Sequence, residues 1–512
     1  MYANTLAMIS KIYSAIPFGF AGHIIEVEGD LNHGLPAFNI VGMANKTISE
    51  SRERVKSAIT NSGFFFPSYK VTINLAPADL NKDGSYLDLP IALSVLILSK
   101  QLLLKDTKNR LFVGELSLDG KLKPIKGIIN IVEAARDAGI EEVYLPSANL
   151  PQAMLIKGPK IYGVSTLQSL FLHLKGQKLI DLPSTSEIPP ESPNLSQDQT
   201  LLDHIRGQQL AKRAIEIAVT GHHNVLISGP PGAGKTLLAK AAASLLPPLS
   251  SEEKISVTKI YSIANLSTAK AITSRPFRSP HHTASPASII GGGTSANPGE
   301  ISLAHSGILF LDELPEFPRP VLEALRQPLE DKSISVSRAN QKVTYPADFM
   351  LIATMNPCPC GYLGDPAHEC TCTNQQIQNY RKKLSGPLFD RIDIFVSVDK
   401  VDNAELIKKP PKNTHQYSVV KNTITGGILR QYLRYKKSGF FNSSLSSYQV
   451  TKLIKLTPAA EKLLASASEN LSLSARSYFK IIKVARTIAD LEAAEIVDTK
   501  HIAEALSFRS PA

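Results

Sequence analysis

A glycine-rich loop between a short apolar run and a run of helix-forming residues constrains this sequence more than any other feature. The apolar run is residues 224–228, the loop is residues 229–236 and the helix formers are residues 237–246. This order of strand, G-x-x-x-x-G-K-T loop and helix is that of a phosphate-binding loop, whose backbone amides and helix N-terminus attract phosphate. It predicts an α/β domain with a parallel sheet, in which a buried strand leads into the loop.

The loop supplies the expected ligands of a nucleotide. We expect the ammonium group of Lys235 to neutralise the β- and γ-phosphates and the hydroxyl of Thr236 to bind Mg²⁺. A simple glycine-rich turn would not explain the pair Lys-Thr at this offset. The residues expected to bind nucleotide here are Gly229, Pro230, Pro231, Gly232, Ala233, Gly234, Lys235 and Thr236.

A second apolar run, residues 307–311, ends in Asp312 and Glu313. A carboxylate at the carboxyl end of a buried parallel strand lies where open α/β sheets bind their ligands. We expect Asp312 to hold Mg²⁺ and Glu313 to polarise the attacking water. The alternative is an ordinary acidic strand end, but the phosphate loop favours hydrolysis. ATP and Mg²⁺ are therefore the expected cofactors, and Lys235 joins the two acids as a catalytic residue.

The phosphate loop and the acidic pair resemble those of the AAA+ ATPases. Residues 350–357 strengthen the resemblance, because they place Asn356 where that family has its polar sensor of the γ-phosphate. Residues 386–393 look like the Asp-Arg segment of the magnesium-chelatase branch, which implies that Arg391 is an arginine finger for the neighbouring subunit. By the same resemblance Arg476, at the start of a predicted helix, is the second sensor and contacts the phosphates. Ordinary surface arginines are the alternative for both.

Along nearly its whole length the chain is similar to the ComM/YifB family of magnesium-chelatase-like ATPases. The matching stretches are residues 74–80, 275–282, 298–305 and 485–490. The resemblance implies a hexameric ring that acts on DNA as a branch-migration helicase in natural transformation. A magnesium-chelatase motor, a protein-remodelling machine and a nucleotide-gated scaffold are the alternatives.

The charge of the chain is compatible with a nucleic-acid partner. Its 512 residues include 56 Lys and Arg against 45 Asp and Glu, which gives a formal net charge of +11. A basic surface attracts polyanions because each neutralised phosphate releases counterions, although a solvated basic surface without a partner is the alternative. The longest apolar stretch, residues 89–98, is far shorter than the roughly 20 residues of a membrane-spanning helix. We therefore expect a cytoplasmic protein without a signal peptide or membrane contact.

Composition divides the chain into several parts. Residues 71–75 and 111–116 are predicted strands, and residues 49–62 and 128–139 are predicted helices. The C-terminal residues 456–506 are almost all helix formers and predict a small bundle. The expected domains are residues 1–176, a Pro- and Ser-rich linker at 177–200, an α/β ATPase core at 201–400, and a basic connector with a helical lid at 401–512.

The first domain resembles the Lon protease domain, which cuts peptides with a serine that a lysine activates. The matching stretches are residues 82–90, 114–120 and 124–129. Aligning them puts Tyr86 at the position of the serine and Ile129 at that of the lysine. Neither side chain can perform the reaction, so we expect an inactive Lon-like α+β domain that serves assembly or DNA contact. A shifted dyad of Ser85 and Lys126 is the alternative.

All 4 cysteines of the chain lie within residues 358–372. They are Cys358, Cys360, Cys370 and Cys372. Four thiolates in two close pairs can surround Zn²⁺ tetrahedrally, as in closed structural zinc sites, and His368 is a possible substitute ligand. Free thiols and disulfides are the alternatives, of which disulfides are rare in a reducing cytosol. A metal here would brace the segment between Asn356 and Arg391.

Residues 333–345 alternate apolar and polar residues around a central Ala-Asn pair, which predicts a β-hairpin. The hairpin directly precedes the predicted sensor strand, where relatives in the magnesium-chelatase branch carry a hairpin that points into the pore of the ring. Arg338 and Lys342 near its tip are candidate contacts to a DNA backbone. Residues 275–293 look like a second mobile insertion, and solvated loops are the alternative for both segments.

Overall fold

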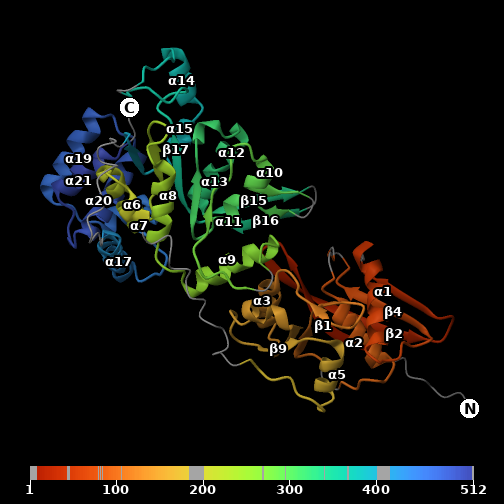
Figure 1. Ribbon diagram of the computed structural model, residues 1–512. Coiled ribbons are helices and arrows are strands. Elements are labelled where there is room, and N and C mark those ends of the chain that lie inside the picture. The colour runs from red at the N-terminus through yellow and green to blue at the C-terminus, as the bar shows by residue number, and fades with distance from the viewer. Residues whose placement is uncertain are drawn as a thin grey trace, which may run out of the picture. The chain divides into compact units, whose positions relative to one another are not determined.

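The chain folds into two compact units, which Figure 1 shows in a computed structural model. Unit 1 comprises residues 1–191 and 251–272, and unit 2 comprises residues 192–250 and 273–512. The structure describes residues 9–42, 46–78, 80, 82, 85–104, 107–183, 201–267, 270–293, 296–338, 341–365, 368–400 and 416–509. Most of the expected linker and the first part of the basic connector therefore lie outside the described residues.

A seven-stranded mixed sheet forms the centre of unit 1, in the order β3-β4-β2-β1-β5-β8-β9. The pairs β1–β2 and β2–β4 are antiparallel, whereas β3–β4, β1–β5, β5–β8 and β8–β9 are parallel. The strands, with the small pair β6–β7, are β1 (Ser10–Phe18), β2 (Ala21–Asn32), β3 (Ala37–Val41), β4 (Lys70–Ala76), β5 (Arg110–Phe112), β6 (Glu115–Leu116), β7 (Leu122–Lys123), β8 (Glu142–Pro146) and β9 (Lys160–Val164).

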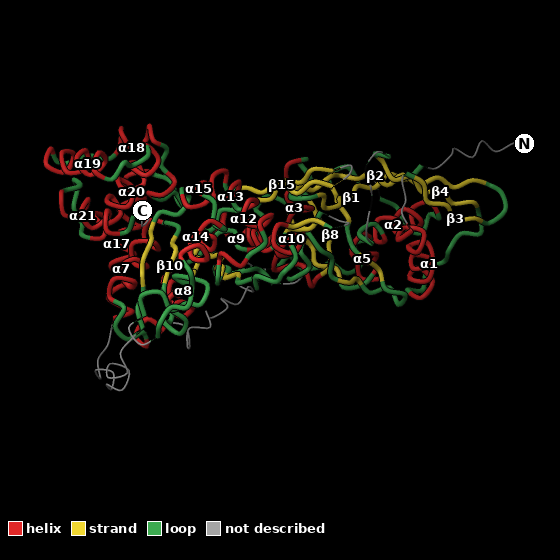
Figure 2. The backbone as a smooth tube through the Cα atoms, turned by 90° about the horizontal axis from the view of Figure 1, so that it is seen from above, coloured by secondary structure: helices red, strands yellow, loops and turns green. Residues whose placement is uncertain are grey.

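Helices cover both faces of this sheet. Successive side chains of a strand point to opposite faces, so one strand can pack against helices on both sides. Ile12 and Ile16 of β1 pack in the same apolar cluster as the fully buried helix α2, whereas Ala15 packs in the cluster of α3. In Figure 2, α1 and α2 lie together on one side of β2, β3 and β4. The helices are α1 (Lys46–Asn61), α2 (Asp88–Leu98), α3 (Ile128–Asp137), α4 (Leu150–Ala153) and α5 (Leu167–Leu174).

The predicted elements of this region are confirmed with small shifts at their ends. The two predicted strands correspond to β4 and to β5 with β6, and the two predicted helices to α1 and α3. The apolar run at residues 89–98 is α2, all of whose residues are buried. No helix of the described residues is long and apolar enough to cross a membrane.

One helix from the range expected for the ATPase core belongs to unit 1 instead. The helix α9 (Ser251–Ile263) packs against α3, and the backbone amide of Gly127 donates to the hydroxyl of Ser262 over 2.8 Å. Lys259 of α9 forms an ion pair with Glu133 of α3. The sequence does not predict this arrangement. The residues of α9 have an ordinary helical pattern, and only tertiary contacts determine which unit a helix joins.

Unit 2 contains a five-stranded sheet in the order β11-β14-β17-β10-β18, and every strand pair in it is parallel. This confirms the predicted α/β class with a parallel sheet. Four of the strands are nearly or wholly buried, as parallel sheets with covered faces require. The strands are β10 (Val225–Ser228), β11 (Phe277–Arg278), β14 (Ile308–Leu311), β17 (Met350–Met355) and β18 (Ile394–Ser397).

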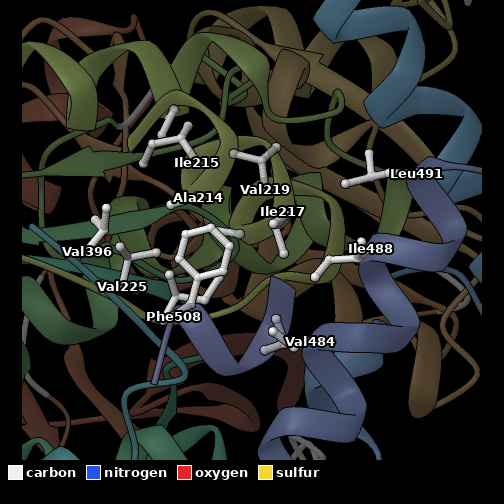
Figure 3. Packing of buried hydrophobic residues seen from close by; sticks show 14 of the residues in the cluster. Ala214, Ile215, Ile217, Val219, Val225, Val396, Val484, Ile488, Leu491 and Phe508 are labelled. Atoms are coloured by element: carbon white, nitrogen blue, oxygen red, sulfur yellow. The ribbon is translucent and has the colours of Figure 1, made fainter. Parts of the chain in front are cut away.

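An apolar core joins this sheet to the C-terminal helices (Figure 3). Val225 and Val396 of the sheet belong to the same apolar cluster as the α7 residue Ile217, the α20 residue Ile488 and Phe508. The larger helices of unit 2 are α7 (Gln209–Gly221), α8 (Lys235–Leu245), α14 (Asn374–Lys382), α17 (Gln416–Tyr435), α18 (Ser447–Leu453), α19 (Pro458–Asn470), α20 (Ala475–Leu491) and α21 (Thr499–Ser507). The helical lid therefore shares one core with the phosphate-loop strand.

A buried charge network holds the lid helices together. Asp490 of α20 is fully buried and accepts hydrogen bonds from Arg434, Arg486 and Asn442. Asn442 also donates to Thr487, whose hydroxyl lies 2.8 Å from Nε2 of His223, directly before β10. Hydrogen bonds therefore link the lid to the strand that precedes the phosphate loop.

Replacing Asp490 with alanine should destabilise unit 2 by about 3–5 kcal/mol, because the buried guanidinium group of Arg486 and the partly buried one of Arg434 lose their carboxylate. Urea or thermal unfolding of the purified chain measures this change. Lys500→Ala is the matched control, since it removes a partner from an exposed ion pair with Glu492 and should leave the transition unchanged. Equal transitions for the two variants would contradict a stabilising network.

Candidate nucleotide site and cysteine cluster

The structure brings the predicted phosphate-loop lysine and the predicted sensor asparagine together. Lys235, in the first turn of α8, donates over 2.8 Å to Oδ1 of Asn356, which follows β17. Its ammonium group also contacts the carbonyl oxygens of Gly229, Pro230 and Met355. Burial lowers the pKa of Lys235, and the nearby charges of Asp312 and Glu313 oppose this shift.

The loop around Lys235 fits a phosphate. All of the oxygens that accept hydrogen bonds from this ammonium group are uncharged, so its charge remains for an anion. A Cβ atom added at Gly232 or Gly234 would point into open space beside the loop. Thr236 is exposed in the same first turn of α8. Lys235, Thr236 and the backbone amides of the loop are therefore the groups that would hold a nucleotide and its Mg²⁺.

A threonine that the sequence analysis did not single out forms hydrogen bonds with both Asp312 and Glu313. The hydroxyl of Thr354 on β17 donates to Asp312 and accepts from the backbone amide of Glu313. This contact follows from the parallel pairing of β14 with β17, in which Leu311 lies opposite Ala353. A threonine inside the apolar run of β17 was the only sequence signal for it.

Glu313 has a backbone conformation that non-glycine residues rarely adopt. Its φ is 54° and its ψ is 51°, in the left-handed region. Such conformations persist where the surrounding structure enforces them and are frequent at active sites. The side chain of Glu313 is half-exposed, and Nδ1 of His282 lies 3.9 Å from its carboxylate. The sequence suggested no partner for His282, and the structure places it beside the predicted catalytic base.

The two predicted arginines share one carboxylate partner, which lies outside the phosphate loop. Within the described residues, Arg391 and Arg476 form ion pairs with the two carboxylate oxygens of Glu330. The backbone carbonyl of Arg391 accepts from the side chain of Asn224 over 2.9 Å. Asn224 also receives the backbone amide of Leu351 on its side-chain oxygen. Arg391 is thus fixed relative to the start of β10 and β17.

The four cysteine thiols form one compact group, and their sulfur atoms lie within 4.8 Å of one another. Cys358 Sγ lies 3.3 Å from Cys360 Sγ, and both lie 3.6 Å from Cys370 Sγ. Zinc–sulfur bonds of about 2.3 Å in a tetrahedron separate the sulfurs by about 3.8 Å, so this arrangement fits a metal. A hydrogen bond from the backbone of Tyr362 is the largest cause that lowers the pKa of Cys360, to about 6, whereas the pKa values of Cys370 and Cys372 are raised, so the fit to a metal rests on the positions of the sulfur atoms.

The cysteine cluster touches the phosphate loop through Gly361. This residue has a φ of +86°, and a Cβ atom on it would lie 2.9 Å from Cδ of Pro231. Pro231 belongs to the predicted phosphate loop, and Cγ of Asn356 would lie 4.0 Å from the same Cβ atom. The turn that follows Cys360 therefore packs directly against the nucleotide-binding loop.

The dyad positions of the Lon-like region contain an apolar contact. Tyr86 packs against the cluster that contains the fully buried Ile129. Ser85, from the alternative dyad, donates its hydroxyl to Glu115, and Lys126 is exposed. The geometry therefore gives no support to a serine activated by a lysine in this region.

Sequence comparison identifies the family once this geometry is known. Three models of magnesium chelatase subunit ChlI match the chain: the subunit itself at residues 201–406, a further segment at 27–149 and the C-terminal part at 415–509. Competence protein ComM of Haemophilus influenzae is 41% identical, over 98% of this chain and 97% of its own. The chain belongs to the ComM/YifB family of magnesium-chelatase-like AAA+ proteins. This places it among ATP-binding proteins and confirms the resemblance seen in the sequence.

Other relatives agree with this assignment. The protein YifB of Escherichia coli is 39% identical over 98% of this chain and 97% of its own. The protein Rv2897c of Mycobacterium tuberculosis is 37% identical over 98% of both chains. The Lon protease 2 of Bacillus subtilis is 27% identical over 29% of this chain and 30% of its own. The Lon likeness of the N-terminal region is thus confirmed as homology.

Replacing Gly361 with alanine should weaken ATP binding about tenfold, because the added methyl group would push against Pro231 and shift the loop. Gly364→Ala is the matched control: its φ is +82°, but an added Cβ meets no atom within 4 Å. Both variants carry the same left-handed strain of about 1–2 kcal/mol. Titration with a fluorescent ATP analogue measures both affinities. Equal affinities would show that the contact does not shape the loop.

Proposed function

We propose that this protein is a ring-forming ATPase of the cytoplasm, composed of six copies, that couples ATP hydrolysis to the movement of DNA strands. Asp312 with Thr236 would hold Mg²⁺, Glu313 would polarise the attacking water and Asn356 would sense the γ-phosphate. Arg391 and Arg476 would act on the nucleotide of a neighbouring copy. Magnesium bound there would supply charge neutralisation of the phosphates.

The observation that carries this proposal is that the predicted catalytic residues of one chain lie in two separate groups. Lys235, Asn356, Asp312 and Thr354 gather at one edge of the unit 2 sheet. Arg391 and Arg476 are instead paired on Glu330, and among the described residues neither forms a hydrogen bond with residues 229–236. Arginines typically contribute about 10³-fold or more to phosphoryl transfer, so a second copy that supplies them would complete the site.

The DNA partner is supported by a hairpin on unit 2. The strands β15 (Ser333–Arg338) and β16 (Gln341–Pro346) pair antiparallel, as predicted. One face of the hairpin is anchored, because Ile334 and Tyr345 are buried and the hydroxyl of Tyr345 donates to the carbonyl of Ala296. Lys342 is exposed near the tip, whereas the side chain of Arg338 lies outside the described side chains. An anchored hairpin with an exposed cation suits contact with a phosphate backbone.

We also propose that the cysteine cluster binds one structural zinc ion. The close grouping of the four sulfurs, within 4.8 Å of one another, and the close approach of Gly361 to Pro231 support it. Zinc would hold the turn after Cys360 in the shape that packs on the phosphate loop. His368 is not needed in this arrangement, because it stacks on Tyr362 and its ring approaches Asp365.

The steady-state ATPase rate should rise several-fold with DNA, most with branched or single-stranded forms, and Arg338→Ala with Lys342→Ala should abolish the rise. The physical reason is the loss of two phosphate contacts, which lowers the salt dependence of binding by about two ions. The assay compares no DNA, single-stranded DNA, duplex and a branched junction at moderate salt. DNA binding is measured in parallel by fluorescence anisotropy.

Two controls make this experiment specific. Lys455→Ala with Lys462→Ala removes two exposed cations from the lid and should leave the stimulation intact. Glu313→Gln should bind ATP but not hydrolyse it, which identifies the turnover as that of this protein. ATPase activity indifferent to every DNA would preserve the motor chemistry and transfer the proposal to a protein or chelatase-type client.

Purified protein should contain about one zinc ion per chain, because four thiolates close a structural site. Cys370→Ser should lose the metal, whereas His368→Ala should retain it. Inductively coupled plasma mass spectrometry on protein purified without chelators measures the zinc content. A wild-type content far below one zinc per chain would contradict the site, and loss of zinc in His368→Ala would reassign a ligand.

A further inference from the structure

A single carboxylate joins the two arginines that this chain would offer to a neighbour. The Oε2 atom of Glu330 lies 2.6 Å from Nη2 of Arg391, and its Oε1 atom lies 2.8 Å from Nη1 of Arg476. Each carboxylate oxygen therefore takes one guanidinium group. Hydrogen bonds of this charge-assisted kind are short and directional.

The three residues come from segments far apart in the sequence. Glu330 lies in α13 (Arg326–Asp331), Arg391 follows α15 (Gly386–Phe389) and Arg476 lies in the first turn of α20. The triad therefore connects the segment before the hairpin, the Asp-Arg segment and the lid. No local pattern in the sequence indicates this meeting.

The two guanidinium groups differ in how firmly they are held. The side chain of Arg391 is only 11% exposed and also donates to the carbonyl of Pro387. Its Nε atom is buried and has no hydrogen-bond partner among the described residues. The side chain of Arg476 is 42% exposed and forms an ion pair with Glu330. Glu330 thus links the exposed side chain of Arg476 to the nearly buried side chain of Arg391.

The triad itself carries a net positive charge. Hydrogen bonding from Arg391, and to a lesser degree from Arg476, lowers the pKa of Glu330, which keeps its carboxylate ionised at neutral pH. Burial lowers the pKa of Lys480 and Lys483 and the charge of Arg476 acts in the same direction, whereas the carboxylate of Asp393 opposes both shifts. One carboxylate between two guanidinium groups leaves a net positive charge, which suits an incoming anion.

We propose that Glu330 is a positioning residue that holds Arg391 and Arg476 as one oriented pair for the terminal phosphate of a nucleotide bound to a second copy. This inference rests on the proposed ATPase function. Two unscreened guanidinium groups repel each other, and a carboxylate between them removes that repulsion before the phosphate arrives. The orientation of both planar groups is then set in advance, and this kind of preorganisation speeds reactions.

The test begins with single-turnover and steady-state ATP hydrolysis of three variants. Glu330→Gln keeps the size of the side chain but removes its charge, and Glu330→Ala removes the contact. Both should lower kcat about 10- to 100-fold with little change in the KM for ATP, because misplacement of a catalytic group by about 1 Å costs rate rather than binding. Glu323→Ala is the matched control, since Glu323 pairs with the single arginine Arg326 over 2.8 Å and should leave kcat unchanged.

A double-mutant cycle distinguishes positioning from a structural role. In a background that carries both Arg391→Ala and Arg476→Ala, Glu330→Gln should change the single-turnover rate less than about 2-fold, because its effect passes through these two arginines. The same rate loss in both backgrounds would overturn the inference, as would faster hydrolysis by Glu330→Gln in the wild-type background. If Arg391→Ala slows hydrolysis but both Glu330 variants do not, only this inference fails. If Arg391→Ala itself leaves hydrolysis unchanged, the proposed arginine role fails, and the inference fails with it.

Discussion

The parallel pairing of β10 between β17 and β18 is the interaction on which unit 2 depends. Ser228, at the end of β10, lies opposite Met355 on one side and Ser397 on the other. The phosphate loop follows β10 in the chain, and Asn356 and the cysteine cluster follow β17. Because parallel strands end at one edge, Lys235 meets Asn356 although 121 positions separate them. At the opposite end, Asn224 holds the backbone of Arg391, so both ends of β10 carry proposed functional groups.

The sequence predicts those features that local rules determine. The phosphate loop, the acidic strand end and the hairpin follow from short patterns, and the parallel sheet follows from the loop that it must support. Asn356 and Arg391 required the family resemblance, because nothing local distinguishes a sensor or a finger from a surface residue. Thr354 and Glu330 were missed for a different reason. Their partners lie on other strands and helices, and no spacing rule connects such positions.

The N-terminal unit has apolar packing at the two positions that the Lon resemblance aligns with a catalytic dyad. At the dyad positions Tyr86 and Ile129 contribute apolar packing, and the backbone carbonyl of Tyr86 accepts from the amide of Gly114 over 3.0 Å. The turn that would present a nucleophile is thus still anchored by main-chain contacts. Homology to Lon proteases therefore concerns the fold of this region, and the fold alone does not carry over their chemistry.

The position of α9 has a consequence for how this chain can be divided. The polypeptide passes between the two units three times, after residues 191, 250 and 272. A cut in the region of residue 191 would leave two covalent connections, so the units would stay joined. A fragment that ends near residue 183 would lose α9 and with it the partner of Glu133. A fragment that begins at residue 201 would carry α9 away from the α3 surface that it covers. Each of the two units is therefore built from two separate segments of the chain, so a single cut cannot divide the chain into the two units.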